Sequence, residues 1–215
     1  MDDSDLTALT DRALRLAGGG RRRILGIAGA PGAGKSTLAA RIVEGLRGRA
    51  ALVPMDGFHL AGAELERLGR ADRKGAPDTF DAAGYAALLR RLRHPAGPDP
   101  VYAPAFDRTL EEPVAGSVCV PADIPLVVTE GNYLLLDEGP WAPVRGLLDE
   151  AWFLDADPGS RVNRLVDRHV RFGKPRPYAE RWVAESDERN ARLVERHRDR
   201  ADLVVRLGPI GSGAP

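Results

Sequence analysis

The sequence is poor in cysteine and histidine and carries no excess charge of either sign. The single cysteine, Cys119, excludes an intramolecular disulfide, and we expect a cytoplasmic protein in a reducing environment. The four histidines are scattered, which leaves too few ligands for a Cys/His zinc site. The 31 basic and 31 acidic residues cancel, whereas a general nucleic-acid or membrane-surface binder needs a sustained basic field.

Long apolar runs and internal repeats are also absent. No stretch is long and apolar enough to cross a bilayer. The N-terminal segment at residues 1–17 is acidic and amphipathic, which differs from a secretory signal. It predicts a surface helix with one apolar face, formed by Leu6, Leu9, Ala13 and Leu16.

Beyond this segment, apolar runs typical of strands alternate with helical patterns, which predicts an α/β fold with a mainly parallel sheet between helices. Five core strands are expected, at 24–28, 51–53, 126–129, 151–154 and 203–205. Helices are expected at about 35–47, 82–93 and 179–198, with a further long helix after Asp157; a Pro-rich stretch at 95–104 and a polar excursion to about residue 121 follow the second of these helices. The 215 residues suffice for one well-buried domain, at 24–208, between a helix and linker at 1–23 and a tail at 209–215.

A glycine-rich segment joins the first core strand to the next helix. Its residues, Gly-Ala-Pro-Gly-Ala-Gly-Lys-Ser at 29–36, fit the P-loop pattern G-x-x-x-x-G-K-[ST]. Glycines let backbone N–H groups close around a phosphate, and the following helix contributes its positive N-terminal end. A chance glycine-rich turn is the alternative, but the required strand and helix flank the motif. The ATP-binding residues predicted here are Gly29, Gly32, Ala33, Gly34, Lys35, Ser36 and Thr37.

Two carboxylates lie where predicted strands end. Asp56 follows the second strand, where it could orient or deprotonate an attacking hydroxyl; the alternative is an aspartate that caps the turn at Gly57. Glu130 ends the strand expected beside the P-loop strand and, with Ser36, is a candidate ligand of Mg²⁺. A buried structural carboxylate is the alternative for Glu130.

Two further segments carry charges in patterns that allow two interpretations. Four arginines share one helical face and run into a Gly/Pro-bearing loop, which is typical of a lid but also of a solvated helix face. They are Arg161, Arg164, Arg168 and Arg171. The segment 102–108 mixes aromatic and charged residues, and it either lines an acceptor pocket or forms an ordinary turn with an Asp–Arg pair.

The order of these motifs resembles a known family. The segments GAPGAGKST, PMDGFH, KGAPDTFD, VYAPAFDR, VTEGNYLLL and RDRADLVV are similar to those of the uridine kinase, type I pantothenate kinase and phosphoribulokinase group. They resemble most closely the small bacterial proteins called nucleoside/nucleotide kinase-like, some of which are called fructose-transport kinases. The resemblance covers about residues 24–205 and implies a P-loop NTPase three-layer sandwich with a helical lid.

The resemblance also implies roles for individual residues. Asp56 corresponds to the proposed catalytic base, Arg168 to a lid arginine, and Asp81 to a helix N-cap. Lys35, Asp56 and Arg168 are thus the expected catalytic residues, and Arg164, Arg168 and Arg171 join the ATP-binding set. The expected acceptor-binding residues are Asp56, Phe58, His59, Tyr102, Asp107, Arg108, Glu130, Tyr133 and Asn190.

The implied activity is an ATP- and Mg²⁺-dependent kinase acting on a hydroxyl of a small metabolite, with the acceptor-binding insertion at about 57–122 and the lid at about 161–178. The acceptor loop, AFDRTLEEPV, matches neither the uridine-kinase nor the pantothenate-kinase version, so nucleoside-like, pantothenate-like and sugar acceptors all remain open. A P-loop ATPase or regulatory protein without an acceptor is the alternative. The guanine-reading N-K-x-D motif of GTPases is absent. We expect a monomer or homodimer without nucleic-acid or membrane partners.

Overall fold

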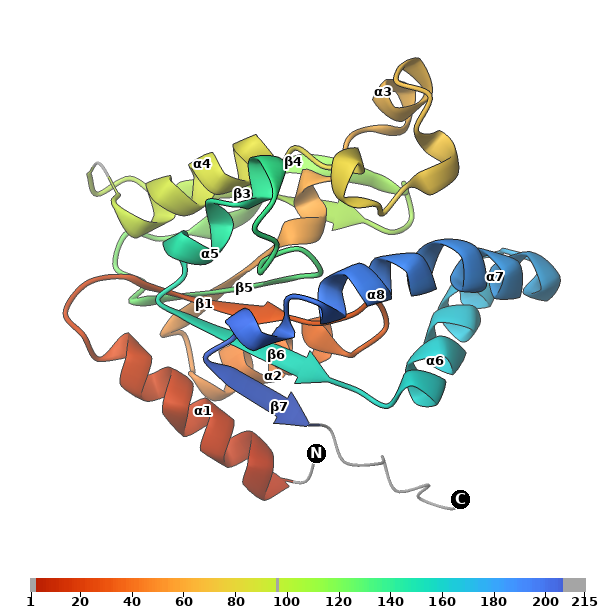
Figure 1. Cartoon of the computed structure of the whole chain (residues 1–215). Helices are drawn as coiled ribbons and strands as arrows, with labels where there is room; N and C mark the ends of the chain where they lie inside the picture. Colours follow the sequence, from red (N-terminus) through yellow and green to blue (C-terminus); the bar gives the residue numbers. More distant parts are fainter. Residues whose placement is uncertain (1–2, 96, 207–215) are drawn as a thin grey trace.

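Five parallel strands form the central sheet of the computed structural model, which describes residues 3–95 and 97–206. The expected tail at 209–215 lies outside the described residues. The sheet confirms the five predicted core strands and their parallel direction (Figure 1). In spatial order they are β2 (Ala50–Pro54), β5 (Leu126–Gly131), β1 (Arg23–Ala28), β6 (Glu150–Asp155) and β7 (Leu203–Arg206).

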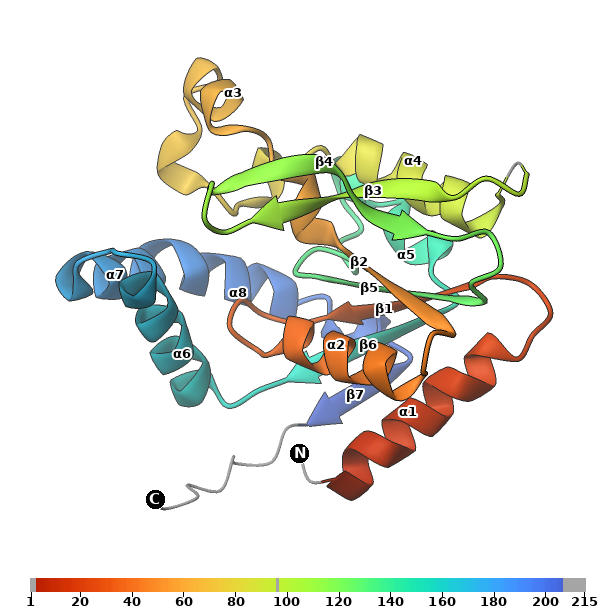
Figure 2. The same cartoon turned by 180° about the vertical axis from the view of Figure 1, so that it is seen from behind.

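Helices cover both faces of this sheet, as the three-layer prediction requires. Along β1, Ile24 and Ala28 enter one apolar core, while Leu25 and Ile27 enter the core on the opposite face. The first core packs against α4 (Ala82–Arg93) and α5 (Val144–Leu147), and the second against α1 (Asp3–Ala17) and α2 (Lys35–Gly45) (Figures 1 and 2). The predicted apolar face of α1 lies in the second core, which confirms the N-terminal helix.

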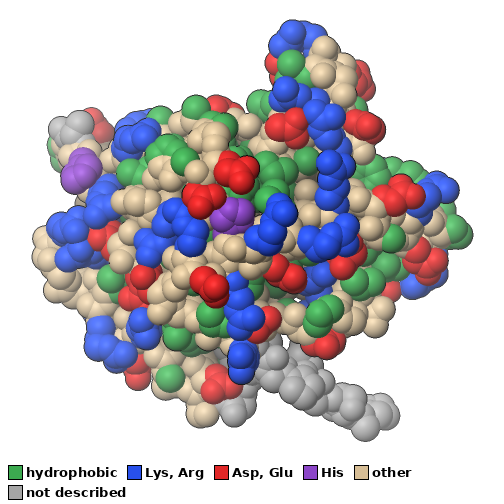
Figure 3. Space-filling view, in the orientation of Figure 1, with side chains coloured by type: hydrophobic (Ala, Val, Ile, Leu, Met, Phe, Trp, Pro, Cys, Tyr) green, Lys and Arg blue, Asp and Glu red, His purple; other side chains and the backbone are tan. Residues whose placement is uncertain are grey.

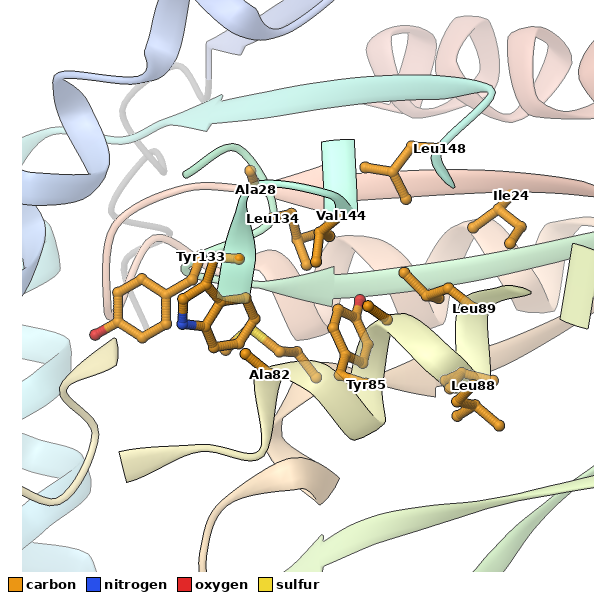
Figure 4. Packing of buried hydrophobic residues seen from close by; sticks show 14 of the residues in the cluster. Ile24, Ala28, Ala82, Tyr85, Leu88, Leu89, Tyr133, Leu134, Val144 and Leu148 are labelled. Atoms are coloured by element: carbon orange, nitrogen blue, oxygen red, sulfur yellow. The ribbon is translucent and has the colours of Figure 1, made fainter. Parts of the chain in front are cut away.

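Aromatic side chains fill the core between α4 and the sheet (Figure 4). Tyr85 is fully buried, and its hydroxyl lies 2.7 Å from the hydroxyl of Thr129 on β5. Thr129 donates its own hydrogen bond to the carbonyl of Val53 on β2 (2.6 Å), so Tyr85 is the donor of the pair. Helix α4 begins after Asp81, whose carboxylate accepts the Gly84 N–H at 2.8 Å, which confirms the predicted N-cap. These bonds fix the carboxyl ends of β2 and β5.

The segment 95–121, which the sequence showed only as Pro-rich and then polar, contains an antiparallel hairpin that was not predicted. Strand β3 (Val101–Asp107) pairs with β4 (Glu112–Val120), and the pairing shifts register around Pro104. Proline donates no ladder hydrogen bond and is therefore confined to edges and bulges, which hid this strand in the sequence. Val101, Ala103 and Val120 are buried in the core beside α4, which stabilises a hairpin that would be marginal alone.

The helix predicted at 179–198 is interrupted. It consists of α7 (Arg176–Trp182), a π-helical turn at Val183–Asp187 and α8 (Glu188–Glu195). Helices α6 (Pro158–Arg171) and α7 form a pair that projects at the same end of the molecule as α3 (Gly62–Arg67) (Figure 1). Within the described ranges, no helix has the length and apolar character needed to cross a membrane.

Candidate active site

The P-loop lies between β1 and α2, where Gly32 and Gly34 adopt positive φ angles of 76° and 97°. A Cβ at Gly32 would lie 2.8 Å from the Arg161 carbonyl, so the loop packs directly against α6. Lys35 is 7% exposed, and its Nζ donates to the Ala30 carbonyl at 3.0 Å and to Asn132 Oδ1 at 2.7 Å. Burial lowers the pKa of Lys35 to about 8, although the carboxylates of Glu130 and Asp56 oppose this shift.

Glu130 lies at the carboxyl end of β5, next to the P-loop strand as predicted. The Ser36 hydroxyl donates to Glu130 Oε1 at 2.8 Å, and the glutamate is 5% exposed. Burial, followed by the negative charge of Asp56, raises the pKa of Glu130, while Lys35 opposes the shift. The charges of Asp56, Glu130 and Lys35 therefore act on one another at the ends of β2, β5 and the P-loop.

Asp56 is carried on a short 3₁₀ turn (Met55–Phe58) that directly follows β2. Its carboxylate lies 3.6 Å from the guanidinium of Arg108 on the hairpin turn and is about one-third exposed. The neighbouring His59 ring packs at 4.0 Å from the Phe80 ring centroid and at 4.9 Å from that of Phe106. Burial lowers the pKa of His59, since the charge of Asp56 does not fully compensate for its desolvation.

A cavity of ≈ 790 Å³ connects these groups. We call the P-loop and Glu130 its floor, and we group other lining residues into two walls, one from the region of α6 and α7 and one from around the hairpin. We call the first wall the lid side, formed by Arg164, Arg168, Arg171, Lys174, Tyr178 and Trp182. We call the second the hairpin side, formed by His59, Lys74, Gly75, Phe80, Phe106 and Arg108. Asp56 also lines the cavity: its charge acts on Lys35 and Glu130 of the floor, and its carboxylate lies 3.6 Å from Arg108 of the hairpin side.

Comparison with known proteins places this architecture in a family, although no family model matches the chain. A Schizosaccharomyces pombe protein named "Putative uridine kinase C227.14" is 32% identical over 95% of this chain and 91% of its own length. The Escherichia coli "Uncharacterized protein YggC" is 33% identical over 93% and 84%. The crystal structure described as a "putative fructose transport system kinase" from Silicibacter sp. TM1040 superposes with a TM-score of 0.84 at 35% identity, over 93% of this chain and 98% of that one.

The chain belongs to the P-loop kinases of the uridine kinase group. Most of the residues predicted for the site of this P-loop kinase lie along one cavity. They are Gly32, Gly34, Lys35, Ser36, Thr37, Asp56, His59, Arg108, Glu130, Arg164, Arg168, Arg171 and Asn190. Gly29 and Ala33 belong to the same loop but do not line the cavity, and Ala33 is buried beneath it.

Four residues predicted to bind the acceptor lie elsewhere. Phe58 packs edge-on against Tyr85 in the core, with ring centroids 5.2 Å apart. Tyr102 is 55% exposed, because it alternates with the buried residues of β3. Asp107 accepts the N–H groups of the hairpin turn, from Thr109 at 2.8 Å and Leu110 at 3.0 Å, and does not line the cavity.

Tyr133 is the fourth, and it lies behind the cavity wall instead of on its surface. Its ring is fully buried among aromatic neighbours, and its hydroxyl donates to the carbonyl of Gly75 (Figure 4 shows the ring). Asn190 donates to the same carbonyl at 3.4 Å while also lining the cavity. Burial is the main cause that raises the pKa of Tyr133, followed by the charges of Asp187 and Asp56. The hydrogen bonds of Tyr133 and Asn190 therefore fix the backbone at Gly75, directly after Lys74.

The arginine row on α6 faces the P-loop and the cavity instead of forming a fully solvated face. Arg161 is 2% exposed, donates to the Pro31 carbonyl at 3.1 Å and pairs with Glu188 of α8. Arg168 has no ion-pair partner in the part of the chain that the structure describes. Burial, followed by the positive charge of Arg108, lowers its pKa. Arg164 has a buried Nε with no described hydrogen-bond partner.

Many cavity residues were not among the predicted site residues, and three of them bear on the chemistry of the site. Asn132, which holds Lys35, follows the end of β5, and its place after a strand at the sheet edge was a usable signal. Lys74 is the first residue of the segment KGAPDTFD that was matched to the family, but the direction of its side chain was not predictable. Asp187, which lies 3.2 Å from His169 Nε2, is oriented by the π-helical turn, and no sequence pattern indicated that turn.

The oxygen donors at the floor fit a hard divalent cation. Ser36 and Glu130 supply a hydroxyl and a carboxylate already in hydrogen-bond contact, and Asp56 is near enough to raise the pKa of Glu130. Mg²⁺ prefers oxygen ligands and typically takes one or two carboxylates together with substrate phosphates. A cation beside Glu130 would also compensate the burial of its negative charge. The residues present therefore fit Mg²⁺.

Proposed function

We propose that this P-loop kinase transfers the γ-phosphate of ATP to a hydroxyl of a small nucleoside-like, pantothenate-like or sugar metabolite. The observation that carries the proposal is the position of Asp56, whose carboxylate lines the same cavity as the P-loop, acts on Lys35 and lies 3.6 Å from Arg108 of the hairpin side. A nucleotide-binding protein without an acceptor needs neither that carboxylate nor that wall. The hairpin side offers polar, charged and aromatic groups to a second ligand.

In this proposal the P-loop amides and Lys35 bind the β- and γ-phosphates, and Lys35 exchanges its contacts with Ala30 and Asn132 for phosphate oxygens. Mg²⁺, held by Ser36 and Glu130, would supply positive charge to the phosphates. Asp56 accepts the proton of the acceptor hydroxyl as its oxygen bonds to the γ-phosphorus and the bond to ADP breaks. Arg168, with Arg164 and Arg171, contributes positive charge from the lid side, where burial strengthens its effect.

The substitution Asp56→Asn tests the proposal, because it keeps the size of the side chain but removes the charge that accepts the proton. An acceptor is first identified by ADP release in a screen of nucleosides, pantothenate, sugars and small alcohols. We expect Asp56→Asn to lower transfer by about two to four orders of magnitude while ATP affinity stays within about threefold. Lys35→Ala should abolish transfer, because Lys35 contacts charge that grows in the transition state.

Asp107→Asn is the matched control, since Asp107 is an exposed aspartate of the hairpin turn outside the cavity. Its transfer rate should remain near that of the wild type. Melting temperature and ATP titration are measured on the same preparations. Undiminished transfer in a stable Asp56→Asn variant would refute the role of Asp56. ATP hydrolysis that no alcohol stimulates would favour the ATPase without an acceptor.

A further inference from the structure

Lys74 on the hairpin side is a cation held in place without a neutralising partner. Its Nζ donates to the carbonyl of Glu111 at 2.6 Å and lies 5.2 Å from the centroid of the Phe106 ring. In the part of the chain that the structure describes, no carboxylate oxygen lies within ion-pair distance of this Nζ. A carbonyl and a ring face orient an ammonium group but leave its net charge available to a ligand.

The backbone beside Lys74 is fixed as well. Tyr133 and Asn190 both donate to the Gly75 carbonyl, and the Gly75 N–H donates to Thr79 Oγ1 at 3.0 Å. A side chain anchored at its tip and at the neighbouring peptide loses little conformational entropy when it binds a ligand. The buried polar groups around Gly75 therefore keep the Lys74 charge at one point of the cavity wall.

The other basic residues of the same segment are treated differently. Arg73 pairs with Asp78 at 2.7 Å, and Arg70 reaches the same carboxylate at 3.5 Å. Asp78 thus compensates the two arginines that do not line the cavity, whereas Lys74, which does, is left without such a partner. This contrast within five residues of sequence distinguishes Lys74 from an ordinary solvated cation.

The second cation of the hairpin side, Arg108, has only Asp56 as a described ion-pair partner, at 3.6 Å. The acidic groups nearby do not cancel these charges at the wall. Asp187 is engaged with His169, while Asp72 and Glu111 are exposed side chains among the lining residues. Burial is the main cause that lowers the pKa of His59, and the positive charges of Lys74 and Arg108 add to it, in keeping with the position of both cations near that ring.

We infer that the acceptor is an anion, a hydroxylated compound whose phosphate or carboxylate group binds Lys74 and Arg108 while its hydroxyl faces Asp56. The inference rests on the proposed function and narrows its substrate class. An oxyanion is the ligand that an oriented ammonium and a guanidinium recognise together. Phe106 and His59 then pack against the carbon skeleton between the two polar ends.

In this arrangement, the charge of the acceptor contributes to how well the kinase binds it and turns it over. With a neutral acceptor, Arg108 stays 3.6 Å from Asp56, and its guanidinium competes with the acceptor hydroxyl for the carboxylate oxygen. An anionic acceptor offers Arg108 another partner, so Asp56 is free to accept the hydroxyl proton. Neutral analogues should therefore lose turnover as well as affinity.

The first experiment measures binding with the P-loop filled. The chain is saturated with Mg²⁺ and a non-hydrolysable ATP analogue, and melting temperature is followed during titration with glycerol, glycerate and glycerol 3-phosphate. We expect a rise with at least one of the two anions and none with glycerol. Lys74→Gln should remove the rise, while Arg73→Gln, which removes an equal charge outside the cavity, should keep it. A rise with glycerate alone identifies a carboxylate, and a rise with glycerol 3-phosphate alone identifies a phosphate. No rise with either anion overturns the inference.

The second experiment measures transfer to pairs of acceptors that differ only in the anionic group: fructose and its phosphates, uridine and its monophosphate, panthenol and pantothenate. We expect the anionic member to be favoured in kcat/KM, and Lys74→Gln to raise its KM about 10- to 100-fold, with kcat and the KM for ATP little changed. Lys74→Arg should retain part of the affinity. Preferred transfer to neutral members overturns the inference but leaves the kinase proposal intact, whereas anion binding without transfer to any member counts against the kinase proposal alone.

Discussion

Charged residues at the two ends of the sheet are stabilised in opposite ways. At the carboxyl end, Lys35 has a lowered pKa and Glu130 a raised one, mainly because both are buried. At the amino end, Asp149 is 4% exposed in its side chain yet accepts the Ile24 N–H at 2.9 Å and pairs with Arg23 at 2.8 Å. Ionisable groups whose pKa is shifted toward the neutral form cluster at functional sites, because a bound ligand can stabilise their charged form there. At the amino end, the protein's own hydrogen bonds and arginines stabilise the charge of Asp149.

Asp149→Asn tests the structural end of this contrast. Arg21, Arg23 and Arg93 would lose their common carboxylate, and we expect the free energy of unfolding at pH 7 to fall by about 2–4 kcal/mol. Burial alone would raise the pKa of Asp149, but its hydrogen bonds and the arginines lower it from 3.8. Its stabilisation is therefore complete above pH 3.8 and is lost as the pH falls through the lowered value.

Urea unfolding at pH 7, 5 and 3 gives the measurement. The stability gap between wild type and Asp149→Asn should be constant from pH 7 to 5 and become smaller toward pH 3. The exposed Asp99 provides the control substitution, Asp99→Asn, which should leave stability within about 0.5 kcal/mol at pH 7. A pH-independent gap would mean that the loss comes from packing and not from charge.

At the scale of elements, the sequence predicted those features of the fold that local sequence patterns determine. The strand before the P-loop, the Asp81 cap and the parallel order follow from apolar periodicity, turn chemistry and the alternation of strands with helices. The hairpin and the π-helical turn did not follow, because tertiary packing stabilises both. Val101 and Ala103 form a strand despite Pro104 since α4 covers them, and Asp187 enters the cavity only through the π-helical turn. The direction of Lys74 depends on Tyr133, which is 59 residues away in sequence (133 − 74).

The hairpin packs so closely against the turn that carries Asp56 that one added methyl group should disturb the contact. A Cβ at Gly57 would lie 2.3 Å from the Pro104 carbonyl oxygen and 3.0 Å from the Ala105 nitrogen. Both are backbone atoms, so Gly57→Ala must move the hairpin away from Asp56. We expect a loss of about 1–3 kcal/mol in stability and at least a tenfold fall in kcat/KM for the acceptor, with ATP affinity within about twofold.

Gly146→Ala is the control for this substitution, because a Cβ at Gly146 meets no atom within 4 Å. Acceptor kinetics measured beside nucleotide titration separate the two walls of the cavity. If Gly57→Ala leaves the acceptor kcat/KM unchanged, the hairpin does not position the acceptor. If it weakens ATP binding equally, the two walls are not independent.

At the scale of the whole molecule, the cavity is formed by segments that are far apart in sequence and meet only at the carboxyl ends of the strands. The P-loop, the turn after β2, the hairpin, α6 and α8 all contribute to it. Acidic and basic side chains are interspersed over the face in Figure 3, in line with the zero net charge. Charge selection therefore arises inside the cavity, from a few oriented groups, and not from the field of the surface.

The arginines of the lid side lead us to predict that nucleotide binding stabilises this part of the molecule. Arg164 has a buried Nε without a described partner, and Arg168 lines the cavity without an ion pair within the ranges 3–95 and 97–206. Phosphate oxygens would supply the missing partners, so binding should stabilise α6 relative to its opened states. We expect Mg²⁺ with a non-hydrolysable ATP analogue to slow amide hydrogen exchange at least severalfold in peptides covering 29–38 and 161–171, but not in α1.

In Arg168→Ala the protection of 29–38 should remain while that of 161–171 is reduced, and kcat should fall more than ATP affinity. Equal exchange of 161–171 with and without nucleotide in the wild type would show that α6 is a fixed wall and not a lid.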